Sequence, residues 1–102
     1  MRQEKIFAVF GLGVYGTEVC KVLADKGCKV IAVDKEQGLI DKVKDIVTEA
    51  ILLDSTNEEA LIQTNLQDVD VAIVAMGNSV DASILTTILL KNLGVPNIIA
   101  RA

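Results

Sequence analysis

The sequence contains no histidine and no tryptophan, and it has only one tyrosine and two phenylalanines among 102 residues. Histidine is the commonest acid or base near neutral pH and the commonest metal ligand, so its absence makes a catalytic or metal site less expected. So few aromatic side chains cannot form a platform on which nucleic-acid bases stack. There is no basic run, and the net charge of −4 disfavours binding to a phosphate backbone. Nucleic acid is therefore not an expected partner.

The sequence also lacks a long uninterrupted hydrophobic run. The longest apolar stretch, 84–95, is broken by polar residues, whereas a membrane span needs about 20 apolar residues in succession. The first residues are polar or charged after Met1 and show no signal-peptide pattern. Cys20 and Cys28 have no metal or redox spacing and suit a reducing compartment. We therefore expect a soluble, cytoplasmic protein that is not inserted into the membrane.

Half of the sequence (51%) is hydrophobic, and strand-like and helix-like segments alternate along it. Strands are predicted at 5–10, 28–33, 47–53, 69–76 and 96–101. Helices are predicted at 14–26, 36–45, 57–65 and 79–93. This order predicts an α/β fold, a Rossmann-like doubly wound parallel sheet of about five strands in three α/β/α layers. Residues 1–102 form one such domain, and because these domains usually continue with another helix and strand, we expect a fragment of a longer regulator.

Several residues mark the ends of the predicted helices. Gly27 and Gly94 stop the first and fourth helices, since glycine readily ends a helix. Thr56 and Glu59 have the spacing of a capping box at the start of the third helix.

The fourth predicted helix is apolar over much of its surface. Either Asn78 or Ser79 can cap its start. Its broad apolar face comprises Val80, Ile84, Leu85, Ile88, Leu89 and Leu93, and Leu90 widens it.

Residues 11–16 read Gly-Leu-Gly-Val-Tyr-Gly and lie directly between the first strand and the first helix. In a dinucleotide-binding motif, Gly11 would permit the tight turn, Gly13 would let a pyrophosphate approach the backbone, and Gly16 would let the helix pack closely. The N–H groups at the start of the helix would then face the phosphates. Asp34 ends the second strand 18 residues beyond Gly16, as the same motif requires. The motif predicts an adenosine ligand that bears phosphates.

Asp34 is the residue expected to bind the ribose. An ionised carboxylate can accept hydrogen bonds from both ribose hydroxyls, and it would repel the 2′-phosphate of NADP. The alternative is a loop carboxylate or a cap of the second helix. Lys35 and Glu36 follow at the same rim and could touch the ribose edge, or they could be ordinary solvated charges.

Further candidates follow the third, fourth and fifth strands. Asp54 and the Ser55 backbone could contact adenine, although Ser55 and Thr56 could equally cap the third helix. Met76, Gly77 and Asn78 end the fourth strand; Gly77 would let the ligand approach the backbone, or it could simply form a turn. Arg101 lies at the carboxyl edge of the fifth strand and could reach the phosphates, or it could be a solvated charge.

Five segments, 7–16, 30–34, 54–56, 72–77 and 83–87, resemble the N-terminal nucleotide-binding domain of Trk/Ktr potassium-uptake regulators, the RCK or KTN domain of TrkA-N type. The resemblance implies a cytoplasmic regulatory subunit, peripheral to the cell membrane, that binds NAD, NADH, ATP or ADP. It implies homodimers, ring assemblies in the full-length protein, and docking on a membrane-embedded potassium-translocating subunit. The dimer contact would lie around Ile84, Ile88 and Lys91.

Carried onto this sequence, the resemblance assigns ligand contacts to Gly11, Leu12, Gly13, Val14, Tyr15, Gly16, Asp34, Lys35, Glu36, Asp54, Ser55, Met76, Gly77, Asn78 and Arg101. Some Ktr members have arginine where this sequence has Val14, and that arginine reaches the terminal phosphate. Val14 cannot distinguish a diphosphate from a triphosphate in that way.

The sequence shows no nucleophile–base pair and no metal-binding constellation. We therefore expect a ligand-sensing regulatory domain rather than an enzyme. The alternative is the cofactor-binding domain of an NAD-dependent dehydrogenase, in which the cofactor carries the hydride and another part of the protein holds the substrate.

Overall fold

The computed structural model describes residues 5–64 and 66–101. It contains one parallel sheet of five strands in the order β3-β2-β1-β4-β5. The strands are β1 (Ile6–Phe10), β2 (Lys29–Asp34), β3 (Glu49–Leu52), β4 (Val71–Val74) and β5 (Asn97–Ala100). The helices are α1 (Val14–Asp25), α2 (Gln37–Val43), α3 (Glu58–Gln63) and α4 (Val80–Asn92), with a 3₁₀ turn, η1, at Leu66–Asp68. The predicted doubly wound fold is confirmed.

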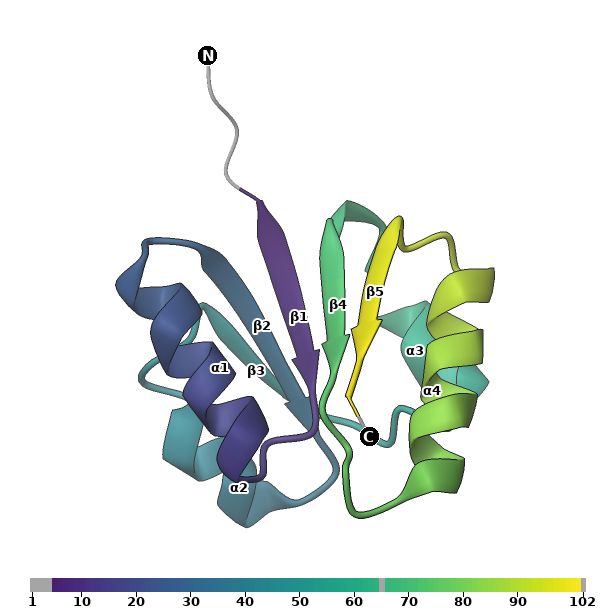
Figure 1. Ribbon diagram of the computed structural model, residues 1–102, viewed down its shortest axis with the longest axis horizontal. Helices are drawn as coiled ribbons and strands as arrows, with labels where there is room; N and C mark the ends of the chain where they lie inside the picture. Colours follow the sequence, from purple (N-terminus) through teal and green to yellow (C-terminus); the bar gives the residue numbers. More distant parts are fainter. Residues whose placement is uncertain (1–4, 65, 102) are drawn as a thin grey trace.

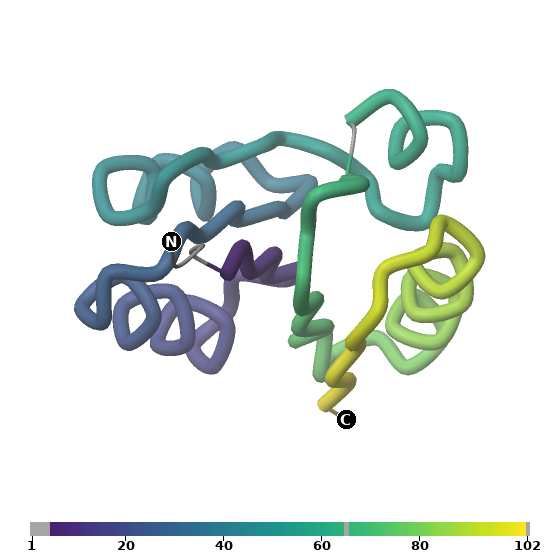
Figure 2. The backbone as a smooth tube through the Cα atoms, turned by 90° about the horizontal axis from the view of Figure 1, so that it is seen from above, coloured from purple at the N-terminus to yellow at the C-terminus, as the bar shows by residue number. Residues whose placement is uncertain are grey.

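β1 lies at the centre of the sheet, and the chain winds outward from it in both directions (Figure 1). Figure 1 shows α1 and α2 beside β2 and β3, and α3 and α4 beside β4 and β5. Figure 2 shows α4 lying along β5 and α1 lying beside β1 and β2. The direction of winding therefore reverses between β1 and β4, and this reversal is where an open α/β sheet forms a crevice at its carboxyl edge.

Alternating residues of the central strand supply two separate hydrophobic cores. Ala8 and Phe10 pack with residues of α3 and α4 in one cluster, while Val9 packs with residues of α1 and α2 in the other. Successive side chains of a strand point to opposite faces, so a strand covered by helices on both faces is apolar at every position. This explains why the β4 sequence, Val-Ala-Ile-Val, is buried throughout.

The predicted capping residues of the helices are confirmed at all but one place. Gly27 and Gly94 have positive φ angles of 80° and 88° just beyond α1 and α4, and Ser79 caps α4 by accepting a hydrogen bond from the Ala82 N–H. The predicted capping box of Thr56 and Glu59 is wrong. Asn57 caps α3 instead, and its side-chain oxygen accepts from the Ala60 N–H at 3.1 Å.

Four strands, β1, β3, β4 and β5, and all four helices are shorter than predicted, and η1 was not predicted. Residue 65, the last of the predicted third helix, lies outside the described residues. The 3₁₀ turn lies inside the connection between α3 and β4, where no hydrophobic period indicates it.

The structure divides the apolar surface of α4 into two sides. Leu89 and Leu90 are buried in the core. On the other side, four large apolar side chains are 42–64% exposed: Val80, Ile84, Leu85 and Ile88. α4 is therefore apolar toward solvent as well as toward the sheet.

Candidate functional site

An open cleft of about 570 Å³ lies at the carboxyl edge of the sheet, at the point where the winding reverses. Its walls come from the segments that follow β1, β2, β3 and β4. Thirteen of the predicted ligand contacts line it: Gly11, Leu12, Gly13, Val14, Tyr15, Asp34, Lys35, Glu36, Asp54, Ser55, Met76, Gly77 and Asn78. The volume is within the usual range for small-molecule sites, about 300–1,000 Å³.

The three motif glycines have different surroundings. Gly11 has φ +101°, and a Cβ there would lie 2.7 Å from the Ala75 carbonyl oxygen. At Gly16, a Cβ would overlap the carbonyl oxygen of Gly11, so its absence lets α1 close onto the turn. A Cβ at Gly13 would meet nothing within 4 Å and would occupy open space. The fold therefore requires glycine at positions 11 and 16, where a side chain would overlap the backbone. At Gly13 it does not, and the missing side chain leaves open space beside the turn.

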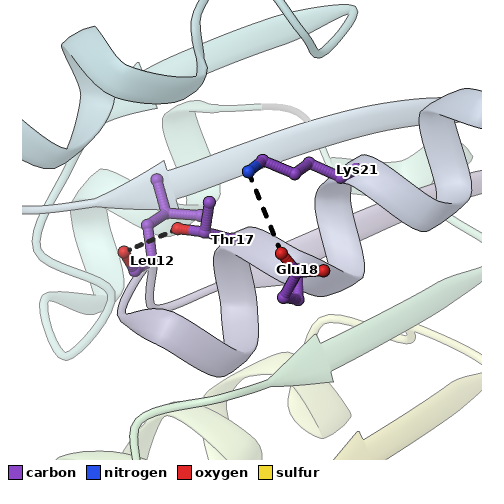
Figure 3. Close-up of polar contacts among 4 residues, drawn as sticks. All are labelled: Leu12, Thr17, Glu18 and Lys21. Carbon is purple, nitrogen blue, oxygen red and sulfur yellow. Dashed lines mark hydrogen bonds and ion pairs between the residues drawn. The ribbon is translucent and has the colours of Figure 1, made fainter.

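The start of α1 is fixed by its own residues, which Figure 3 shows. The Thr17 hydroxyl donates to the Leu12 carbonyl oxygen at 3.0 Å, and the Thr17 N–H donates to the Gly13 carbonyl oxygen at 2.9 Å. One turn further on, the Lys21 ammonium lies 3.8 Å from the Glu18 carboxylate on an exposed surface, where an ion pair contributes little to stability. Thr17 is therefore the side chain that ties the glycine turn to the helix.

Both carboxylate oxygens of Asp34 are engaged by backbone N–H groups. Its Oδ2 accepts from the Leu12 N–H at 2.8 Å, and its Oδ1 accepts from the Glu36 N–H at 3.0 Å. Each oxygen can accept more than one hydrogen bond, so the carboxylate keeps the capacity to bind two hydroxyls. Asp34 thus joins the turn after β1 to the turn after β2, and its side chain lines the cleft.

Asp54 shapes the turn that follows β3. Its Oδ1 accepts from the Thr56 hydroxyl at 2.6 Å and from the Thr56 N–H at 3.0 Å. These two hydrogen bonds favour the ionised carboxylate and hold the pKa of Asp54 below its usual value. Thr56 thus bonds to Asp54 rather than capping α3.

Ser55 lies in the same turn, but its hydroxyl points into the protein. Its Oγ is 2.8 Å from the Oγ1 of Thr86 in α4, and 3.9 Å from the Sδ of Met76, to which it donates. Ser55 is 5% exposed and Thr86 is 0% exposed. The side chain of Ser55 is therefore a buried link to α4, and its backbone forms part of the cleft wall.

Arg101 lies beside the main cleft rather than in it. Its guanidinium carbon is 4.2 Å from the centre of the Tyr15 ring. Arg101 lines a small cavity of about 40 Å³ together with Tyr15, Ala75 and Gly77. Except for Arg101, these residues also line the main cleft. The predicted cation is thus adjacent to the cleft and held against an aromatic ring.

The structure separates the fifteen predicted contacts into three groups. Thirteen line the cleft, Arg101 lines its neighbouring cavity, and Gly16 is buried beneath the glycine turn. Some cleft residues were not predicted: Val33, Leu39, Leu53, Thr56, Ala75, Ser79 and Ala82. Several of these directly precede or follow a predicted contact, so extending each strand-end segment by one residue would have found them. Leu39 and Ala82 lie in helices, and no motif marks them.

Within residues 5–64 and 66–101, no helix is long and apolar enough to span a membrane. No group of three or more carboxylate or thiol side chains in this part of the chain could hold a metal ion.

A parallel sheet wound in both directions from its central strand, with a glycine turn in the crevice at its switch point, defines a Rossmann-like domain. More particularly, the chain belongs to the TrkA-N domain family, whose model matches residues 7–102. The resemblance seen in the sequence is therefore confirmed.

Curated relatives are longer than this chain. It is 41% identical over 99 residues to the Ktr system potassium uptake protein C of Bacillus subtilis (strain 168), a match that covers 97% of this chain and 45% of that protein. It is 39% identical to the Ktr system potassium uptake protein A of Vibrio alginolyticus, with the same coverage. The chain thus spans less than half the length of these relatives.

Solved structures share the fold. The NAD(P)-binding domain of an exopolyphosphatase-related protein from Archaeoglobus fulgidus superposes with a TM-score of 0.82 at 24% identity, covering 94% of this chain and 71% of that one. The TrkA-N domain of the inner membrane protein ybaL from Escherichia coli gives a TM-score of 0.64 at 13% identity, covering 98% and 90%. At these identities the likeness shows the fold alone.

Proposed function

We propose that the chain binds an adenine nucleotide in the cleft and is the nucleotide-sensing regulatory part of a potassium-uptake system. The observation that carries the proposal is Gly13, whose missing Cβ leaves open space in a cleft that Asp34 also lines. A glycine needed for close approach and an acceptor for the ribose are the two components that an adenosine ligand with phosphates requires.

The order of the walls suggests how the nucleotide lies. Phosphates would lie on the N–H groups of residues 13–15, where the start of α1 favours anions. The ribose would bond to Asp34, and the base would lie between the turn after β3, around Ser55, and the segment around Met76. The phosphate tail would extend toward Gly77 and Arg101. NAD, NADH, ADP and ATP all fit this description, whereas NADP would place a 2′-phosphate against Asp34.

The regulatory role that we propose is supported by two relatives that are named as parts of a potassium uptake system. A ligand regulates a partner when it binds two conformations unequally and shifts the equilibrium between them. We place the full-length protein in the cytoplasm, assembled as a homodimer and in rings, and docked on a potassium-translocating membrane subunit.

The exposed side of α4 is the proposed dimer contact. Its four large apolar side chains, Val80, Ile84, Leu85 and Ile88, would lose their contact with water if two copies met there. Ile84→Glu should therefore yield monomers at concentrations where the wild type dimerises, as measured by sedimentation velocity. Ile62 in α3 is equally exposed, at 55% for both residues, so Ile62→Glu is a matched control that should still dimerise. Equal behaviour of the two variants would place the dimer contact elsewhere.

Calorimetric titration with ATP, ADP, NAD, NADH and NADP tests the ligand. Asp34→Ala should weaken the adenosine ligands by about 1–3 kcal/mol, the cost of losing a charged hydrogen bond. Asp25→Ala is the control, because it removes the same charge at the far end of α1. Tighter binding of NADP than of every ligand with a free 2′-hydroxyl would refute the assignment of Asp34.

The proposed regulation of potassium uptake is tested by a second measurement, in cells. Cells whose own gene for this protein encodes Asp34→Ala should differ from the wild type in potassium uptake from medium with limiting potassium. Normal uptake by a variant that no longer binds nucleotide in vitro would refute the regulatory role and leave nucleotide binding intact.

A further inference from the structure

The buried contact between Ser55 and Thr86 joins the turn after β3 to the middle of α4, the helix that begins after the β4 end of the cleft. Ser55 follows β3, and Thr86 lies in α4, 31 residues further along the chain. Their hydroxyl oxygens are 2.8 Å apart in a place that solvent barely reaches. Ser55 lines the cleft, whereas Thr86 lies behind it.

The Ser55 hydroxyl has two neighbours with which it can share a hydrogen bond. Its oxygen lies 2.8 Å from the Thr86 hydroxyl oxygen, where either group can be the donor, and 3.9 Å from the Sδ of Met76, which can only accept. The three side chains thus form a chain from α4, through Ser55, to Met76, and the last two are both in the cleft wall.

These contacts restrict the position of the Ser55 side chain, because a buried hydroxyl that loses its hydrogen-bond partner destabilises the protein. Thr86 holds the Ser55 side chain inward, which leaves the Ser55 backbone facing the cleft. The turn cannot readily adjust on its own, since Asp54 and Thr56 are bonded to each other across it. Loss of the Thr86 hydroxyl would therefore change the positions of both Ser55 and Met76.

We infer that Thr86 is a positioning residue of the nucleotide site, which acts through Ser55 to hold the wall that receives the base. The inference rests on the proposed function, because it needs a nucleotide in the cleft. Thr86 itself touches no ligand.

The test compares variants of two neighbouring threonines by titration with ADP. Thr86→Val removes the hydroxyl with little change in shape and should weaken ADP about three- to tenfold, the effect of one lost hydrogen bond. Thr86→Ser keeps the hydroxyl and should bind ADP as the wild type does. Thr87→Val is the matched control: the Thr87 hydroxyl donates within α4 to the Ser83 carbonyl oxygen at 2.7 Å, so its loss should leave ADP affinity unchanged.

Ser55→Ala tests the same bond from its other end and serves if Thr86→Val does not fold. It should weaken ADP to a similar extent, and adding Thr86→Val to it should produce no further loss. Urea unfolding of each variant separates affinity from stability. If Thr86→Val lowers stability but binds ADP like the wild type, or if Thr86→Ser is as weak as Thr86→Val, the positioning role is refuted and the proposed function stands. If the wild type binds none of the adenine nucleotides, the proposed function fails, and this inference fails with it.

Discussion

Replacing Gly13 by alanine should weaken ligand binding strongly without harming the fold. The added methyl group would meet no protein atom within 4 Å, and Gly13 has a φ angle of −71°, which alanine adopts without strain. Alanine caps a helix slightly less well than glycine, but it also lowers the conformational entropy of the unfolded chain. These two effects are of similar size and opposite sign. We therefore expect the free energy of unfolding to change by no more than about 0.5 kcal/mol.

Ligand affinity should respond quite differently. The methyl group would stand in the space through which a pyrophosphate approaches the N–H groups of the turn. Loss of even one charge-assisted hydrogen bond costs about 1.5–3 kcal/mol, so ADP affinity should fall at least tenfold.

Gly16→Ala supplies the contrast. Its methyl group would overlap the Gly11 carbonyl oxygen, and relieving that overlap should cost about 1–3 kcal/mol of stability. Urea unfolding and ADP titration of both variants make the comparison. If Gly13→Ala bound ADP as tightly as the wild type, the phosphate position would be wrong, and so would the reasoning from the empty space at Gly13.

The remaining predictions concern three other side chains. Burial raises the pKa of the Cys20 thiol from 9.0 to about 11, so the folded state keeps a proton that the unfolded state loses. Stability should therefore fall as the pH rises through this interval, and Cys20→Ala should reduce that fall in urea unfolding at pH 8 and pH 10.5. Val14 lines the cleft and is 88% exposed; Val14→Arg should tighten ATP more than ADP, by about three- to tenfold in titrations, and an unchanged ratio would contradict this. Arg101→Gln should weaken ADP about threefold or more but leave adenosine binding unchanged, because in the proposed arrangement the guanidinium would contact only the phosphates; equal weakening of both ligands would place Arg101 elsewhere.

Much of the fold could be predicted from the sequence because its signals are local. Apolar runs of strand length alternate with helical periods, and glycines mark the ends of α1 and α4. The cleft followed from the same information, since the carboxyl ends of parallel strands meet at one edge. Knowing which segments end a strand was enough to place thirteen of the fifteen contacts in it.

What could not be predicted depends on contacts between distant segments or on competition between near neighbours. Thr56 has the right spacing for a capping box, but Asp54 competes for it, and Asn57 is left to cap α3. Ser55 and Thr86 are separated by 31 residues, and no local pattern links them. The two apolar sides of α4 look alike in sequence, because packing against the sheet and exposure to solvent both use leucine, isoleucine and valine.

The two hydrogen bonds that Asp34 accepts have a consequence for how the cleft can respond. They join the glycine turn to the turn after β2 through the protein's own atoms. The ligand therefore need not order this side of the cleft, and affinity gains from such preorganisation. A wall that is already in place changes little when it is occupied. The wall around Ser55 and Met76 is bonded to α4 instead, so a ligand that displaced that wall would transmit the displacement to the helix.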